Sequence, residues 1–376
     1  MGERLHFAAH SHHFWPDVTR DAQIRCWDDA AEMSDEKWEH VLGNVWADAS
    51  TRIAQHLNLP ASDTLVPAPN THEFVSRLLS CLPTERPMRI LTTDGEFHSF
   101  RRQCARLAEE GLADVTIVPC APYETFADRF IAAGTESAAP DLIFFSQVFF
   151  DSGYVVEGLE KIVDGLGAKN SLLVIDGYHG FLAKPSDISA VADWAFYLAG
   201  GYKYAMAGEG ACFMHCPSAI APRPRNTGWY ASFGSLAEEQ KGVAYGPGGV
   251  RFMGSTFDPS GIYRMQASLT WLDELNLTAA DVHAHAQALQ ERFLSRLREA
   301  AAGPLKRVAL LLEPAKCPVG NFLTFDVPDA GALHQLLKEN GIDVDYRGTR
   351  LRVGFGLYQS TADVDALIER LSRING

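Results

Sequence analysis

Short apolar runs alternate with longer amphipathic stretches from about residue 62 onward. The runs occupy residues 89–94, 114–119, 141–148 and 171–176, and the clearest amphipathic stretches between them occupy 99–111 and 125–134. Brief buried runs that alternate with helical periodicity predict an α/β fold, with a mostly parallel sheet and helices on both faces. Several runs end in polar residues, at 92–94, 146–147 and Asp176. Because ligands bind at the carboxyl ends of parallel strands, these residues are the first candidates for a site.

The pattern changes after about residue 255. Two long amphipathic stretches come first, and a strand, a helix, two strands and a last helix follow, at 260–276, 278–303, 321–327, 330–341, 342–347, 350–356 and 361–374. This order is typical of a smaller α+β domain. We therefore expect a large α/β domain at 41–265 and a small α+β domain at 266–376. The His- and Trp-rich segment 1–40 is expected to pack on the small domain or on the site.

Charge and composition narrow the class of protein. The chain has 376 residues, a net charge of −14 and a pI near 5.4, which argues against nucleic acid or an anionic membrane as a partner. The first residues lack the apolar core of a secretory signal, and no apolar run reaches the ~18 residues of a membrane span. Seven scattered cysteines do not indicate a disulfide framework. We expect a cytoplasmic protein.

Two features of the sequence could indicate other chemistry, namely a group of histidines and one cysteine. His10, His12 and His13 lie close together, but no acidic or histidine partner follows at ligand spacing, so no metal site is predicted and the role of these histidines stays open. Cys317 precedes Pro318 and a predicted strand without a glycine-serine loop, which does not favour a nucleophilic thiol.

Lys203 lies in the segment AGGYKY, between two tyrosines and just after two glycines. Earlier in the chain a predicted strand ends in Asp176, with His179 three residues later. Pyridoxal 5′-phosphate (PLP) needs an amine to form a Schiff base and an anion to hold its protonated ring nitrogen. Burial among tyrosines would lower the pKa of the lysine and favour the neutral amine. Lys203 could also be a structural lysine and Asp176 a helix cap, but together the two residues favour the cofactor.

Other residues could hold the rest of such a cofactor. Asn70 and Thr71 precede an amphipathic helix, and the free amides of a helix N-terminus bind phosphate. The hydroxyl of Tyr202 could contact the same group. Phe97 follows a predicted strand and could stack on a flat ring, although it could equally be a core aromatic residue.

These pieces, in this order, resemble the fold-type-I PLP enzymes of the class V aminotransferase family, and within that family kynureninase most of all. SQVFFDSG at 146–153 resembles the family's S-x-V-x-Y-x-T-G turn, DGYHG at 176–180 its D-x-x-H and GGYKY at 200–204 its S-Y-K-Y. TGWYASFG at 227–234, RFMGSTFDP at 251–259 and LRVGFGLYQS at 351–360 resemble its G-W, F-R-x-S-N-P-P and I-R-V-A-P-x-P-L-Y-N-S segments.

The resemblance implies a role for each matching residue. Lys203 would form the Schiff base and move the Cα proton, Asp176 would pair with the ring nitrogen, and Arg352 would hold the substrate carboxylate. The remaining contacts of the cofactor ring and phosphate would be made by Asn70, Thr71, Phe97, Ser99, His179 and Tyr202. Trp229 and Thr256 match positions that reach the phosphate from a neighbouring subunit, so a homodimer with its site at the subunit interface is implied.

The sequence departs from the family on the substrate side. Thr256 replaces an Asn, and AHSHH at 9–13 replaces G-N-S-L-G. The leading hypothesis is a PLP-dependent enzyme that acts on an amino acid, with kynureninase-like hydrolytic Cβ–Cγ cleavage of a γ-keto amino acid. Transamination and cysteine desulfurase or β-lyase chemistry stay open as alternatives. So do a PLP-binding protein without catalysis and a nucleotide-binding dehydrogenase.

Overall fold

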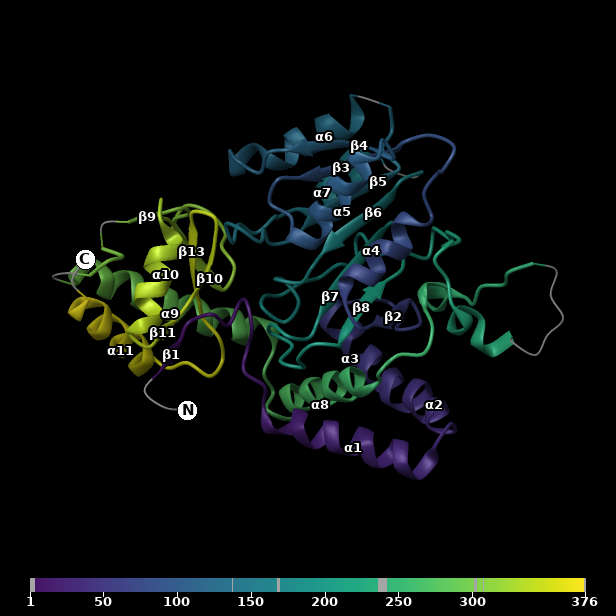
Figure 1. Ribbon diagram of the computed structural model, residues 1–376, viewed down its shortest axis with the longest axis horizontal. Coiled ribbons are helices and arrows are strands. Elements are labelled where there is room, and N and C mark those ends of the chain that lie inside the picture. The colour runs from purple at the N-terminus through teal and green to yellow at the C-terminus, as the bar shows by residue number, and fades with distance from the viewer. Residues whose placement is uncertain are drawn as a thin grey trace.

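The computed structural model of the chain describes residues 4–136, 138–167, 170–235, 242–300, 303–306 and 308–374. Figure 1 shows a large α/β body and a smaller body that contains the C-terminus. Helices α1, α2 and α8 lie side by side below the large body, and the N-terminal segment runs between the two bodies. None of the helices that are described is both long and apolar enough to cross a bilayer.

The large body is built on a seven-stranded sheet with the order β2-β8-β7-β6-β5-β3-β4. Its strands are β2 (Leu65–Ala68), β3 (Met88–Thr93), β4 (Ala113–Val118), β5 (Leu142–Ser146), β6 (Leu172–Asp176), β7 (Ala195–Gly200) and β8 (Cys212–His215). Strand β8 is antiparallel to β7 and β2, while β4, β3, β5, β6 and β7 pair in parallel. The predicted α/β class is therefore confirmed.

The central strands are apolar along their whole length because both faces of the sheet are covered. In β5, Ile143 and Phe145 pack into one layer of the core, while Leu142 and Phe144 pack into the other. Side chains of a strand point alternately to opposite faces, so two buried faces require an unbroken apolar run. The polar end of such a run then falls at the edge of the sheet.

The described helices belong either to the large body or to the smaller body. They are α1 (Asp17–Met33), α2 (Lys37–His40), α3 (Ala47–Leu57), α4 (Thr71–Leu79), α5 (His98–Glu109), α6 (Phe126–Thr135), α7 (Leu159–Leu166), α8 (Ser260–Glu274), α9 (Ala279–Glu299), α10 (Ala330–Glu339) and α11 (Thr361–Arg373). A π-helical turn spans Val41–Trp46, and 3-10 turns lie at Tyr123–Thr125, Trp229–Ser235 and Gly248–Phe252.

The smaller body contains a four-stranded antiparallel sheet with the order β12-β13-β10-β9. Its strands are β9 (Ala309–Leu310), β10 (Phe322–Asp326), β12 (Asp345–Arg347) and β13 (Arg350–Gly354). Helices α9, α10 and α11 pack against it around a core of its own, consistent with the expected α+β texture.

The N-terminal segment belongs structurally to the smaller body before it crosses to the larger one. Strand β1 (Leu5–His6) pairs in parallel with β11 (Ile342–Asp343), and Phe7 enters the core of the smaller body. The chain then passes His10 and reaches α1, which packs along α8. This path brings the first histidines next to the carboxyl edge of the large sheet.

Candidate functional site

A cavity of about 390 Å³ lies at the carboxyl edge of the large sheet. Eight residues expected from the sequence line it together: Asn70, Thr71, Phe97, Ser99, Asp176, His179, Tyr202 and Lys203. Parallel pairing explains the convergence, because Ser146 at the end of β5 is in register with Asp176 at the end of β6. Gly177 follows this end, and a Cβ there would lie 1.9 Å from the Tyr197 ring, so only glycine lets the chain turn so close to β7.

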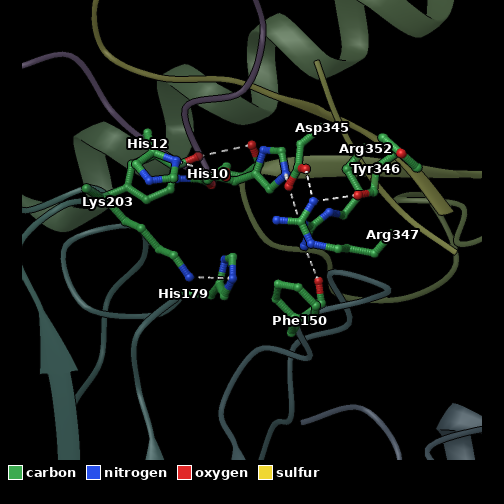
Figure 2. A network of polar contacts seen from close by, with 12 residues as sticks. His10, His12, Phe150, His179, Lys203, Asp345, Tyr346, Arg347 and Arg352 are labelled. Atoms are coloured by element: carbon green, nitrogen blue, oxygen red, sulfur yellow. Dashed lines mark hydrogen bonds and ion pairs between the residues drawn. The ribbon is translucent and has the colours of Figure 1, made fainter. Parts of the chain in front are cut away.

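Lys203 lies in the loop after β7 and is buried, with 5% of its surface exposed. Its amine is 2.7 Å from Nε2 of His179 (Figure 2). It also lies 4.7 Å from the centre of the Tyr178 ring. Burial lowers the pKa of this amine to about 7, against the opposing attraction of Asp176. A substantial fraction of the amine is therefore neutral near pH 7, as a nucleophile or base requires.

Asp176 is held at the strand end by the backbone. Its Oδ1 accepts a hydrogen bond of 2.9 Å from the amide of Tyr178. Burial raises the pKa of the carboxyl to about 6, while the Tyr178 amide and the positive charge of Lys203 oppose that rise. At neutral pH the carboxylate is present, and it can hold a cationic group placed in the cavity.

His179 lies between the cavity and the smaller body. Burial and the neighbouring Lys203 lower its pKa well below the usual value, so the ring is neutral. Its Nε2 faces Lys203, and its buried Nδ1 has no hydrogen-bond partner among the described residues. That nitrogen is free to contact a bound molecule.

The N-terminus of α4 meets the same cavity. Asn70 caps this helix, because its side-chain oxygen accepts a 3.0 Å hydrogen bond from the amide of Glu73. Thr71 is the first helical residue, and the helix dipole favours an anion beside it. On another wall, Phe97 immediately precedes α5, and its ring centre lies 5.1 Å from that of Phe150.

Sequence reasoning missed Glu96. Its carboxyl is buried beside the cavity edge and contacts the Thr93 hydroxyl at 2.6 Å, and the Ser146 amide and hydroxyl at 3.0 and 2.5 Å. Burial raises its pKa to about 8. Ser146 lines the cavity, so Glu96 orients a cavity hydroxyl. The sequence signal was present, since a carboxylate closely follows a strand end at Thr93.

Arg352 does not line the cavity. It is 1% exposed on β13, where it donates to Asp345 and, over 2.5 Å, to the backbone oxygen of Phe150 (Figure 2). Phe150 does line the cavity, and the guanidinium lies 4.3 Å from the centre of its ring. Arg352, which is expected to bind the substrate carboxylate, is thus separated from the cavity by the Phe150 side chain. It is instead paired with the carboxylate of Asp345 within the protein.

Trp229 and Thr256 lie outside the cavity in this chain. Trp229 is 42% exposed, and Thr256 lines a separate hollow of about 280 Å³. Pro69 belongs to the walls of both this hollow and the cavity. The predicted role of both residues in a neighbouring subunit stays a prediction.

The three N-terminal histidines separate from one another. His10 is buried near Asp345, His12 stacks on Tyr202 with ring centres 5.1 Å apart, and His13 contacts the backbone of Phe14 and Leu357. Across the described ranges, no three His, Cys, Asp or Glu side chains are placed to hold a metal ion together.

The thiols of Cys212 and Cys317 also lie in different places. Cys212 lines the cavity, 3.5 Å from the hydroxyl of Tyr178, and burial raises its pKa to about 12. Cys317 lines a different and larger hollow of about 580 Å³ between the two bodies, together with Lys184 and His283. A thiolate at the cavity is therefore disfavoured.

The residues of the cavity fit PLP. Lys203 offers a neutral amine for an aldehyde, and Asp176 offers an anion for a ring nitrogen. The start of α4 suits a phosphate, Phe97 offers a ring face, and Nδ1 of His179 offers an unpaired polar contact.

The family comparison agrees with this fit. A family model described as aminotransferase class-V matches residues 35–367 of the chain. Among curated protein sequences, none matches the chain.

Several solved structures share the fold. The complex of the cystine C–S lyase C-DES with its reaction product cysteine persulfide has a TM-score of 0.84 and 18% identity, covering 100% of this chain and 99% of that chain. A C-DES variant with glycine covalently linked to its PLP cofactor has a TM-score of 0.85 and 18% identity, covering 100% and 97%. The cysteine desulfurase CsdA from Escherichia coli has a TM-score of 0.79 and 18% identity, covering 98% and 94%.

The burial of Lys203 predicts a pH-dependent stability of the cofactor-free protein. Its pKa is about 7 in the folded chain, whereas an ordinary solvated lysine has a pKa of 10.5, so the unfolded chain binds the extra proton between these values. Stability should therefore rise with pH in this window, by up to about 1.4 kcal/mol per pH unit. In Lys203→Met this rise is lost. The free energy of unfolding of both proteins is measured by denaturant titration from pH 7.5 to 9. Lys161→Met is the control for the loss of a surface lysine. An equal pH response of wild type and Lys203→Met would contradict the burial of a neutral amine.

Proposed function

The chain belongs to the aminotransferase class-V family and is a PLP-dependent enzyme, and from this premise we propose that it is a β-lyase that removes a sulfur-containing group from the Cβ of an amino acid. Lys203 would bind the cofactor aldehyde, Asp176 the ring nitrogen, and Asn70, Thr71 and Tyr202 the phosphate. Phe97 would lie on the ring, with Ser99 and His179 at its polar edge. Arg352 would hold the substrate carboxylate.

The chain's own groups suit proton removal at Cα. The neutral amine of Lys203 is a base beside the cavity, and His179 at 2.7 Å holds its orientation. PLP, when bound, supplies the electron sink that makes the Cα proton acidic. Lys203 would hold this proton for return to the products, while the electron pair of the Cβ–S bond would leave with sulfur.

One observation favours release of the sulfur group over its transfer to the protein. Of the cysteines in the described chain, Cys212 is the one at the cavity, and burial raises the pKa of its thiol to about 12. A thiol that stays protonated is a poor acceptor of sulfur. Cys317 lines the hollow of about 580 Å³ between the two bodies and not the cavity. C-DES, a solved structure of the same fold, is named a cystine C–S lyase, so the fold accommodates this reaction.

Kynureninase-like hydrolysis is the second candidate. It rests on the motifs around Asp176 and Arg352, whereas the solved structures of this fold reported above are a C–S lyase and a cysteine desulfurase. Transamination is the third alternative, because the same proton removal by Lys203 serves it.

Covalent attachment of the cofactor to Lys203 is directly testable. Borohydride treatment of the PLP-loaded wild type should bleach its absorption band and add the mass of the reduced cofactor to the peptide containing residue 203. In Lys203→Ala neither change should occur. Lys184→Ala serves as the control and should leave the labelling intact. Lys184 is a half-buried lysine that lines the hollow of about 580 Å³ rather than the cavity. Label on any other lysine of the wild type would contradict the assignment.

Product analysis separates the candidate reactions. We expect cystine to give pyruvate, ammonia and cysteine persulfide, at a rate reduced by about 10³-fold or more in Lys203→Ala because the base is lost. Cys317→Ala and Cys212→Ala should keep the reaction if no protein thiol accepts sulfur. Anthranilate and alanine from kynurenine would instead favour the hydrolase. Keto-acid exchange that depends on an amino donor would favour the transaminase.

We also propose that the enzyme is a homodimer in which Trp229 and Thr256 face the cavity of a second copy. Trp229 and Phe233 are 42% and 39% exposed, and both belong to an aromatic cluster with the buried Tyr230. Exposed aromatic residues of this kind are typical of interfaces. The hollow containing Thr256 adjoins the cavity through Pro69.

Light scattering tests this arrangement. Wild type should show twice the chain mass of 41.3 kDa at micromolar concentration. Trp229→Ser combined with Phe233→Ser should shift the protein toward the monomer and weaken PLP binding. A wild type that is monomeric at every concentration, or a double variant that keeps both the dimer and the cofactor affinity, would overturn the proposed interface.

A further inference from the structure

We propose that Glu96 is a positioning residue whose buried carboxyl carries a proton and donates it in a hydrogen bond to Ser146, so that the Ser146 hydroxyl donates in turn to Asp176 inside the cavity. When Glu96 loses this proton, the hydroxyl donates to Glu96 instead, and Asp176 loses its donor. The inference deepens the proposed function and rests on its assignment of the cofactor's ring nitrogen to Asp176.

Neutral hydrogen-bonding groups enclose the carboxyl of Glu96, which is 1% exposed. Its Oε1 accepts hydrogen bonds from the Thr93 hydroxyl at 2.6 Å and from the Ser146 amide at 3.0 Å. The Thr93 hydroxyl itself accepts a hydrogen bond of 3.1 Å from the Gly95 amide, which leaves its hydrogen for Glu96. Two donors therefore satisfy Oε1, and the acid proton belongs on the other oxygen, Oε2.

The surroundings of Glu96 favour the neutral carboxyl. Burial raises its pKa to about 8, and the negative charge of Asp176 adds to this rise, while the hydrogen bonds to Glu96 oppose it only in part. Cys104 on α5 and Cys120 after β4 also act on this carboxyl, but burial raises the pKa of both thiols, so they stay uncharged. Of the two buried carboxyls, Glu96 thus holds the proton at pH 7 and Asp176 holds the charge.

Ser146 connects this acid to the cavity. Its hydroxyl oxygen lies 2.5 Å from Oε2 of Glu96, and the residue lines the cavity. Either partner of this contact can supply its hydrogen, because a protonated carboxyl and a hydroxyl are both donors. When Glu96 donates, the single hydrogen of the Ser146 hydroxyl remains for an acceptor in the cavity. When Glu96 is ionised, the carboxylate takes that hydrogen.

The sheet places Asp176 beside this hydroxyl as the acceptor. Ser146 ends β5 and Asp176 ends β6, the two residues are in register, and both line the cavity. Neighbouring strands lie about 4.8 Å apart, so the hydroxyl is within reach of the carboxylate. The Tyr178 amide already donates to Oδ1 of Asp176. A second donor would keep the carboxylate ionised despite its burial, as the pairing with a cationic ring nitrogen requires.

Pyridoxine 5′-phosphate tests the inference without the Schiff base. This molecule has the ring nitrogen and the phosphate of the cofactor but no aldehyde, so Lys203 forms no bond with it. Its dissociation constant for the cofactor-free protein is measured by calorimetry from pH 5 to 9. Ionisation of the ligand itself is the same for every variant and cancels when variants are compared.

Glu96→Gln tests the alkaline side of this profile. The amide keeps the acceptor for Thr93 and gives Ser146 a permanent N–H donor in place of the acid proton. Between pH 7 and pH 9 the wild type should lose up to about tenfold more affinity than this variant, because a carboxyl with a pKa of about 8 loses about nine tenths of its protonated form by pH 9. In the wild type the donor to Asp176 is then lost, and the cavity gains a negative charge against an anionic ligand.

The matched control is Glu109→Gln, which removes an exposed carboxylate from α5. It should lose affinity with pH as the wild type does. Equal losses of affinity in Glu96→Gln and in the wild type would overturn the inference.

Ser146→Ala tests the acid side of the profile. Without the hydroxyl, Asp176 loses a donor and its pKa rises. The affinity should therefore fall to half at a pH about one unit higher than in the wild type. Glu96→Gln should keep the wild-type value, because its Ser146 hydroxyl still donates to Asp176. An unchanged acid midpoint in Ser146→Ala would overturn the role of the hydroxyl.

The proton on Glu96 is observable in the wild type without any ligand. Infrared difference spectra should show the carbonyl stretch of a protonated carboxyl at pH 7, which disappears with a midpoint near pH 8 and is absent in Glu96→Gln. If Glu96→Gln fails to fold, this spectrum and Ser146→Ala decide the question. A wild type without such a carboxyl at pH 7 would overturn the inference. Borohydride labelling of residue 203 and pyruvate formation from cystine report separately on the proposed function.

Discussion

The burial of one amine against one carboxylate governs this structure. Lys203 lies in a low-dielectric setting at the edge of the large sheet, with Asp176 lining the same cavity. Burial alone would suppress the charge of both groups, and their attraction partly opposes this. The outcome is an amine with a pKa of about 7 and a carboxyl with a pKa of about 6, which suit an enzyme working near neutrality. The parallel pairing that ends β6 and β7 at one edge makes this juxtaposition possible.

The site depends equally on how the two bodies meet. Arg352 on the smaller body donates to the backbone of Phe150 on the larger one, and the N-terminal segment inserts His10 next to this contact. Residues from the start, the middle and the end of the chain therefore surround one small region (Figure 2). Closing this region excludes water, which strengthens each electrostatic interaction within it.

The distribution of thiols separates the candidate reactions more sharply than the fold does. The same fold carries C–S lyases and desulfurases among its relatives, so the fold alone does not choose between them. In this chain Cys212 is buried against Tyr178, and Cys317 lies in the other hollow between the bodies. In the proposed lyase reaction, sulfur leaving a substrate at Lys203 would meet protonated or distant thiols, which favours its departure as part of a free product.

The sequence by itself determined the α/β class, the strand ends and the pairing of a lysine with an aspartate. These features are local, since apolar runs buried on both faces and a polar residue at each run's end are visible without any contact information. Tertiary structure alone decided which distant groups share the cavity. It placed Glu96 behind Ser146, paired Arg352 with Asp345, and sent His10, His12 and His13 in different directions. The physical reason is that burial and pairing depend on what packs against a residue from elsewhere in the chain, and neighbouring letters do not encode that partner.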